Sequence, residues 1–315
     1  MKRDKIVYGA LLCGVVLLCN SCMLGRRQIK SPELELPATV VAGATDSLTM
    51  ADMAWWNVYS DSTLTALIER TLERNKDMLA ASARVRRMRA LGRVARADQL
   101  PSVSGQLVAD TEHNDYDGEA AKNDPEFDAK VSLAWELDLW GNLRWANRKA
   151  VAEYLATVDA QRALQMTLVA EVATAYYELV ALDQELSIVR RTLQTRKEGV
   201  RQARLRFEGG LTSETALQQA KVELASTATL IPGLESRIAL KEHQIALLAG
   251  AYPTLRIDRQ TMEMHARLPE RLKVGLPSEL LKRRPDLRQS EQTLRAAEAA
   301  MGMASADRFP RITFS

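Results

Sequence analysis

The sequence predicts a mainly α-helical protein that carries a transmembrane β-hairpin. Residues 127–141, FDAKVSLAWELDLWG, alternate between apolar and polar side chains, which is typical of a strand with one apolar and one wet face. Two long segments instead place apolar residues three and four positions apart, which is the pattern of coiled-coil helices. Residues 281–313 also repeat the pattern of residues 72–104, so the architecture restarts within the chain.

The composition agrees with a helix-rich protein. The chain has 315 residues, of which 46% are hydrophobic, 26% charged and 5% aromatic, as expected for long amphipathic helices. Its net charge of +3 is too small to indicate a nucleic-acid partner. The three cysteines, Cys13, Cys19 and Cys22, all lie near the N-terminus, so the rest of the chain has no disulfide framework and no cysteine metal site.

The N-terminus has the features of an export signal. A basic start, residues 1–5, precedes an apolar run, residues 6–18, which is shorter than the ~20 residues of a spanning helix and fits a signal-peptide core. We predict that residues 1–21 are a lipoprotein signal peptide and that Cys22 becomes the lipidated first residue of a chain exported from a bacterial cytoplasm. Plain signal cleavage and an uncleaved anchor are the alternatives, because Cys19 stands where such signals usually have Leu or Val.

Two helices are predicted after an N-terminal extended segment, residues 22–60. Asp61 is a suitable N-cap, and apolar residues then recur at helical spacing. A second helix, rich in alanine and arginine, starts at about Lys76. Helices therefore occupy residues 61–98.

Residues 101–140 are predicted to form the β-hairpin. Residues 101–110 alternate as residues 127–141 do, and the acidic stretch 111–126 joins them as a polar loop. The second strand alone fits a globular edge strand equally well, but the paired strands and the long loop favour an outer-membrane barrel. The polar positions expected to line a water-filled pore are Ser102, Ser104, Gln106, Asp128, Lys130, Ser132, Glu136 and Asp138.

A coiled-coil hairpin is predicted over residues 145–249. One apolar seam runs from Leu168 to Phe207 and the other from Leu217 to Leu248. Because the second helix is much shorter than the first, the returning chain stops partway along it, and residues 251–280 form a connecting segment at mid-height.

A glycine-containing turn joins the two seams. Its residues are Gly209, Gly210, Leu211, Thr212 and Ser213. The glycines can end the first helix, and Thr212 or Ser213 can cap the second. These residues form the tip of the helical hairpin; the alternative is that they only connect two helices.

The charged positions do not indicate catalysis. The scattered histidines lack metal-ligand spacing, and Gly209-Gly210 lacks the surroundings of a phosphate-binding loop, so we expect no enzyme activity, no metal and no cofactor. Glu171, Glu178 and Glu185 are interpreted as a solvated helix face. The arginines of residues 84–96 favour pairs on the helix surface or between protomers over nucleic-acid binding; they are Arg84, Arg86, Arg87, Arg89, Arg93 and Arg96.

The internal repeat has an offset of 209 residues, from Leu72 to Leu281. Its identical pairs include Ala90 and Ala299. The second copy, residues 281–315, stops where a second hairpin would begin, so we expect the chain to be a C-terminally truncated form of a longer protein.

The chain resembles the TolC-like outer-membrane factors, and within them the NodT-like efflux lipoproteins. The motifs that carry the resemblance are residues 135–141 (WELDLWG), 207–213 (FEGGLTS) and 275–287 (GLPSELLKRRPDL). The resemblance implies a homotrimer in which the strands build a 12-stranded outer-membrane β-barrel. The long helices would build a periplasmic α-barrel.

The resemblance also implies a function and partners. Such trimers are exit ducts that export small molecules, and their helical tips, here residues 209–213, meet a periplasmic adaptor bound to an inner-membrane RND-type pump. An open sheet edge is not tolerated in lipid, so several chains must share one barrel. The alternatives are a type I secretion exit duct and a periplasmic adaptor protein, although the internal repeat argues against an adaptor.

Overall fold

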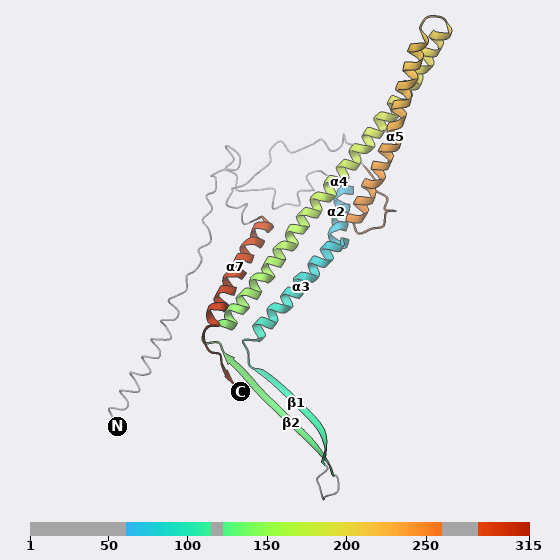
Figure 1. Cartoon of the computed structure of the whole chain (residues 1–315). Coiled ribbons are helices and arrows are strands. Elements are labelled where there is room, and N and C mark those ends of the chain that lie inside the picture. Colours follow the sequence, from blue (N-terminus) through green and yellow to red (C-terminus); the bar gives the residue numbers. More distant parts are fainter. Residues whose placement is uncertain (1–60, 115–121, 260–282) are drawn as a thin grey trace, which may run out of the picture. The chain divides into compact units, whose positions relative to one another are not determined.

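The structure is a computed structural model that describes residues 61–114, 122–259 and 283–315 (Figure 1). Of the two units into which the chain divides, Pro37–Ser315 contains all of the described residues. The predicted signal peptide, the predicted lipidation site Cys22 and the predicted extended segment 22–60 lie outside the described residues, as does most of the connecting segment 251–280.

Helices α2, Ser62–Arg74, and α3, Lys76–Ala97, occupy the predicted range. Asp61 Oδ1 accepts hydrogen bonds from the backbone N–H groups of Thr63 and Leu64 at 2.8 and 3.0 Å, which confirms the predicted N-cap. The two helices are separated by Asn75, which caps α3 in the same way.

Helices α4, Asn142–Glu208, and α5, Glu214–Leu248, form the predicted antiparallel hairpin. At 1.5 Å per residue, α4 extends about 100 Å. The seams are buried at their centre, for example at Leu179, whereas Phe207 at the distal end is 38% exposed, contrary to prediction. No helix within the described ranges is both long and apolar enough to cross a membrane.

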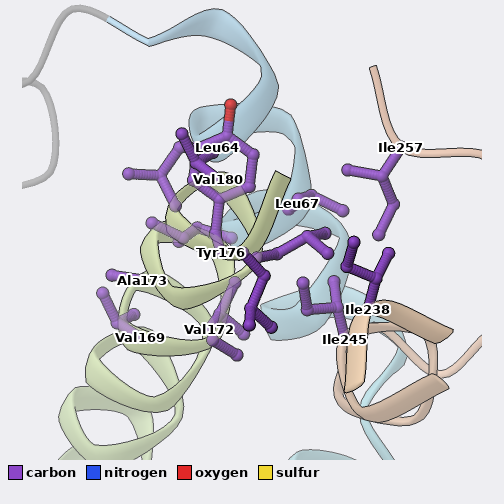
Figure 2. Packing of buried hydrophobic residues seen from close by; sticks show 14 of the residues in the cluster. Leu64, Leu67, Val169, Val172, Ala173, Tyr176, Val180, Ile238, Ile245 and Ile257 are labelled. Atoms are coloured by element: carbon purple, nitrogen blue, oxygen red, sulfur yellow. The ribbon is translucent and has the colours of Figure 1, made fainter. Parts of the chain in front are cut away.

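The hydrophobic core lies where α2, α4 and α5 meet (Figure 2). Leu64, Leu67 and Ile68 of α2 are buried in the same cluster as Tyr176 and Val180, which lie on a face of α4 beside the predicted seam. This second face lies outside the predicted seam, whose spacing gives α4 only one partner helix. Helix α4 therefore contacts α2 and α5 at once.

The junction of α2 and α3 is tied to the end of α5. Asn75 Nδ2 donates a hydrogen bond of 3.0 Å to the carbonyl oxygen of Leu248. Gly250 follows α5 with φ 60°, and a Cβ at this position would collide with the carbonyl oxygen of Arg74, so only glycine fits. The returning chain thus stops partway along α4, as the helix lengths predicted.

Strands β1, Ser102–Asn114, and β2, Lys122–Leu137, pair antiparallel, with Ser102 opposite Ala134 and Asn114 opposite Lys122. The predicted loop 111–126 was too long, since both of its ends continue the ladder and only residues 115–121 lie between the strands. The acidic composition misled the prediction: the ladder is made by backbone groups, which exposed acidic side chains do not interrupt.

The secondary structure follows the sequence repeat. Helix α7, Pro285–Ala306, has the same 22-residue length as α3 and starts 209 positions later. Strand β3, Ile312–Phe314, then pairs antiparallel with β2, which places the strands in the order β1–β2–β3. Helix α4 packs against both α3 and α7, so the helix order α3–α4–α7 matches the strand order.

Candidate functional site

The hairpin has two chemically different faces. Ser104 lies directly opposite Ser132, and Gln106 opposite Lys130. Residues directly opposite each other on antiparallel strands share a face, so the predicted polar positions of the two strands lie together. The other face is apolar and exposed: Leu107 is 87% and Phe127 82% accessible.

The polar face carries more acidic side chains than the sequence predicted for it. Asp110 lies opposite Glu126, and both side chains are exposed. Glu126 was missed because it was placed in the loop. The register with β3 adds Thr313, which lies opposite Glu136.

Asp138 does not belong to this face, contrary to prediction. It lies after the end of β2, and its two carboxylate oxygens accept hydrogen bonds of 3.0 Å from the backbone N–H groups of Leu143 and Arg144. The Arg144 guanidinium also forms an ion pair with it at 3.0 Å. Asp138 therefore satisfies the free N–H groups at the start of α4 and fixes the turn from strand to helix.

The WELDLWG motif forms the joint between sheet and helices. The Trp135 indole donates to the carbonyl oxygen of Gln99 at 3.3 Å. The Trp140 ring stacks on Phe309, with centroids 4.7 Å apart, and its indole N–H donates to the carbonyl oxygen of Pro310 at 2.9 Å. The motif thus connects the first repeat with the start of the second, which the sequence did not reveal.

Ion pairs join α4 and α5 along the helical hairpin. Glu178 pairs with Lys241 at 2.6 Å and Glu185 with Arg237 at 3.7 Å. These glutamates are about half exposed, at 53% each, but they are not only a solvated face as interpreted from the sequence. Sequence spacing within one helix could not reveal partners on another.

A partly buried charge cluster fixes the segment that follows α5. Arg259 forms an ion pair with Asp183 of α4 at 2.8 Å and another with Glu242 of α5. Partial burial raises the pKa of Asp183 above its ordinary value, and the Arg259 charge opposes this shift. Arg259 therefore holds its own segment against both α4 and α5, near the end of α5 that lies away from the tip.

The arginine-rich part of α3 lacks such pairs. All six arginines are exposed, and none forms an ion pair with any residue that the structure describes; they are Arg84, Arg86, Arg87, Arg89, Arg93 and Arg96. Their predicted pairs on the helix surface are thus not seen within the described part of one chain. Pairs between protomers remain the prediction.

The tip between α4 and α5 has a defined C-cap. Gly210 has φ 75°, the Leu211 N–H donates to the carbonyl oxygen of Arg206, and the Gly210 N–H donates to that of Phe207. This is a Schellman motif, which requires a left-handed residue. Leu211 is left 78% exposed at the apex. Ser213 precedes α5, but its side chain makes no capping hydrogen bond, contrary to prediction.

The described residues contain no group of three or more His, Cys, Asp or Glu side chains placed to hold a metal ion. What the geometry assembles is a β-hairpin with one polar and one apolar face, a strand–helix joint and a long helical arm with an exposed apolar tip.

Comparison with known proteins decides the family. Residues 67–251 match the family described as outer membrane efflux protein. The chain belongs to this family. Nodulation protein T of Rhizobium leguminosarum bv. viciae is 31% identical over 302 residues, which cover 95% of this chain and 62% of that protein. The cation efflux system protein CusC of Escherichia coli O157:H7 is 28% identical over 305 residues, 96% of this chain and 65% of CusC.

Solved structures of outer-membrane channels have the same fold. The channel OprN superimposes with a TM-score of 0.76 at 31% identity, over 90% of this chain and 65% of OprN. CusC superimposes with a TM-score of 0.72 at 28% identity, over 90% of this chain and 65% of that chain. The chain thus spans just under two thirds of the length of these relatives. As an outer membrane efflux protein, it is an outer-membrane protein that extends into the periplasm.

Proposed function

We propose that this outer membrane efflux protein is one subunit of a trimeric channel that exports small molecules from the periplasm. The observation that carries the proposal is the hairpin, with an exposed apolar face and a polar face. Within the described residues, β1 has no partner on its outer edge. Lipid cannot satisfy such an edge, which supports a strand of another copy as its partner.

The assembly would be a 12-stranded barrel above a helical periplasmic barrel. The apolar face of the hairpin would meet lipid, and the polar face would line the pore. The pore-lining residues in this proposal are Ser102, Ser104, Gln106, Asp128, Lys130, Ser132 and Glu136. Cys22 would carry the lipid anchor, as the name of the Salmonella typhimurium relative, probable outer membrane lipoprotein SilC, suggests.

The partners would be a periplasmic adaptor and an inner-membrane RND-type pump, which together with the channel make a tripartite system. Among relatives, SrpC of Pseudomonas putida is named a solvent efflux pump outer membrane protein. Such names support small-molecule efflux over a type I secretion duct or an adaptor. The exposed tip, residues 209–213, would contact the adaptor.

Leu211→Glu tests the tip. Leu211 is 78% exposed at the apex, so a charge there is expected to disrupt an apolar contact with the adaptor without unfolding α4 or α5. Cells that depend on this channel should become more sensitive to toxic solvents, dyes and toxic metal cations, while native electrophoresis still shows three chains. Leu205→Glu, at a 55% exposed position before the turn, is the matched control and should leave sensitivity unchanged.

The outcomes separate the parts of the proposal. Unchanged sensitivity in the Leu211→Glu cells would reject the tip contact. Protein that runs as a single chain would reject the trimer, and cells that gain no resistance from the unaltered protein would reject efflux.

A further inference from the structure

Four of the six exposed arginines of α3 lie along one side of the helix. They are spaced three, four and three positions apart, so at about 3.6 residues per turn their side chains form a single stripe; they are Arg86, Arg89, Arg93 and Arg96. The stripe runs beside the side that faces α4, where Ala81 is buried and Ser82 accepts a hydrogen bond of 2.9 Å from Gln161 of α4. Arg84 and Arg87 lie on the other side of α3.

The start of α4 continues this stripe. Gln161, which contacts α3, and Asp159, which lies 3.6 Å from Arg288 of α7, mark the two packed sides of α4. Arg144 and Arg148 are exposed between these two sides, on the same side of the α3–α4 layer as the stripe. Together the six arginines form one basic surface; they are Arg86, Arg89, Arg93, Arg96, Arg144 and Arg148.

Little negative charge opposes the basic surface within the described residues. Its four arginines on α3 form no ion pair with any residue that the structure describes. On α4, Arg144 pairs with Asp138, and the Arg148 guanidinium lies 4.6 Å from the centre of the Trp145 ring. An aromatic ring does not neutralise a guanidinium, so six arginines stand against one carboxylate.

The handedness of the chain sets the direction in which this surface points. The Ser102 hydroxyl donates to the carbonyl oxygen of Ala134 at 3.1 Å, so this carbonyl points toward β1. In a strand of L-residues, the direction of a carbonyl group is coupled to that of the side chain. When the polar face, which includes Ser132, lines the pore, an observer outside the barrel with the periplasm below sees β1 to the right of β2.

The helices follow the same order. Helix α3 lies on the same side of α4 as β1 lies of β2 (Figure 1). Because both helices are right-handed, this order turns the arginine side of α3 and of α4 toward the outside observer. The basic surface therefore points outward and away from the pore.

The basic surface begins at the level where the hairpin ends. Strand β2 ends at Leu137, five residues before the start of α4. The end of α3 is held to the same level, because the Gln99 amide donates to the carbonyl oxygen of Leu143 at 3.3 Å. At 1.5 Å per residue, Arg93 and Arg96 lie within about 6 Å of the end of α3. Since the headgroup region of a bilayer is about 5–8 Å thick on each side, these arginines lie at headgroup level.

We propose that the basic surface binds the phosphate groups of anionic phospholipids in the leaflet that faces the periplasm. Guanidinium groups match phosphate oxygens in charge and in their paired hydrogen-bond geometry. One arginine close to an anionic membrane surface favours binding by about fivefold, and the attraction falls off within a Debye length of ~8 Å. The inference rests on the proposed channel, whose polar face lines the pore, and adds the class of lipid that surrounds its helices.

The lipid preference of the protein tests this surface. Full-chain protein is placed in phosphatidylethanolamine vesicles that contain spin-labelled phosphatidylglycerol or spin-labelled phosphatidylethanolamine. Electron paramagnetic resonance then measures how much of each label the protein immobilises. The unaltered protein should immobilise phosphatidylglycerol several-fold more than phosphatidylethanolamine at low salt. This preference should nearly disappear at about 1 M salt, where the Debye length is ~3 Å.

Two double variants locate the preference. Arg93→Gln with Arg96→Gln should lose most of it, because these are the arginines of α3 nearest the headgroups. Arg84→Gln with Arg87→Gln is the matched control, since it removes the same charge from the other side of α3, and it should keep the preference of the unaltered protein. Inorganic phosphate added at constant ionic strength should displace no phosphatidylglycerol.

Four outcomes would overturn the lipid surface. They are the absence of a preference in the unaltered protein, a preference that persists at high salt, equal losses in the two double variants, and displacement by inorganic phosphate, which would identify a site for the free ion. Altered anion selectivity of the channel current in Arg93→Gln with Arg96→Gln, with unchanged lipid preference, would place these arginines in the pore and also reject the proposal.

Native electrophoresis reads the assembly independently. Any of these outcomes in protein that runs as three chains rejects the lipid surface alone. Protein that runs as a single chain rejects the proposed channel as well.

Discussion

At the residue scale, short polar side chains fix the ends of the helices. Asp61 was found from the sequence because it directly precedes an apolar periodic run. Asn75 was missed because one side chain serves two helices, capping α3 and binding the last turn of α5. Asp138 was missed because it caps α4 from outside the helix, beyond Gly141.

Asp138→Asn tests the strand–helix joint. The amide can keep one of the two backbone hydrogen bonds but loses the charge that pairs with Arg144 and complements the helix start. The free energy of unfolding should fall by about 1–2 kcal/mol. Thermal denaturation in detergent measures this change, and hydrogen exchange at the Leu143 and Arg144 amides locates it.

Asp128→Asn is the control for Asp138→Asn. Asp128 is exposed on the polar face of β2, so its substitution should change stability by no more than about 0.5 kcal/mol. Equal effects of the two substitutions would show that Asp138 does not anchor α4.

At the element scale, the alternation of side chains within β1 and β2 gives the hairpin one apolar and one polar face. A shift of one residue in the register of a strand would move every side chain of that strand to the opposite face. The register confirms the faces predicted from alternation alone. It also extends them through residues that composition had assigned to a loop.

Val131→Lys tests the lipid-facing side of the hairpin. Val131 is 80% exposed on the apolar face. A lysine on the lipid side of a barrel costs about 2–4 kcal/mol near the middle of the bilayer. The yield of protein inserted in the outer membrane, and its urea midpoint in vesicles, should both fall.

Ser132→Lys supplies the comparison, because Ser132 is the next residue and lies on the polar face. It should insert as the unaltered protein does. If Ser132→Lys were the more damaging change, the polar face and not the apolar face would be the one that meets lipid.

At the scale of the whole molecule, α4 connects the two repeats. It packs against α3 of the first and α7 of the second. Between α4 and α7, Asp159 is only 2% accessible and lies 3.1 Å from Arg162 and 3.6 Å from Arg288. This carboxylate therefore holds the start of the second repeat to the first.

Asp159→Ala should loosen α7. The two arginine side chains are about half exposed and keep access to water, so the expected loss is about 1–2 kcal/mol, below the cost of stranding a fully buried charge. Hydrogen exchange along α7 should rise more than along α3.

Glu153→Ala is the matched control on the same helix. Glu153 is 42% exposed, and among the described residues its carboxylate pairs only with Lys149 one turn away, an interaction expected to contribute under about 0.5 kcal/mol. The role of Asp159 would be contradicted if Glu153→Ala accelerated amide hydrogen exchange in α7, or if Asp159→Ala left that exchange unchanged.

The sequence by itself determined the helices, the two-faced hairpin, the glycine turn and the repeat, because each depends on the spacing of residues close together in the chain. Only the tertiary structure decided which residues serve as partners across elements. Glu178 and Lys241 lie far apart in sequence, as do Asp159 and Arg288, so no local period could pair them. Only the tertiary structure also showed that Ala90 is exposed and Ala299 is buried, although they are identical residues at equivalent positions of the repeat. Their burial differs because α4 lies against a different side of each helix.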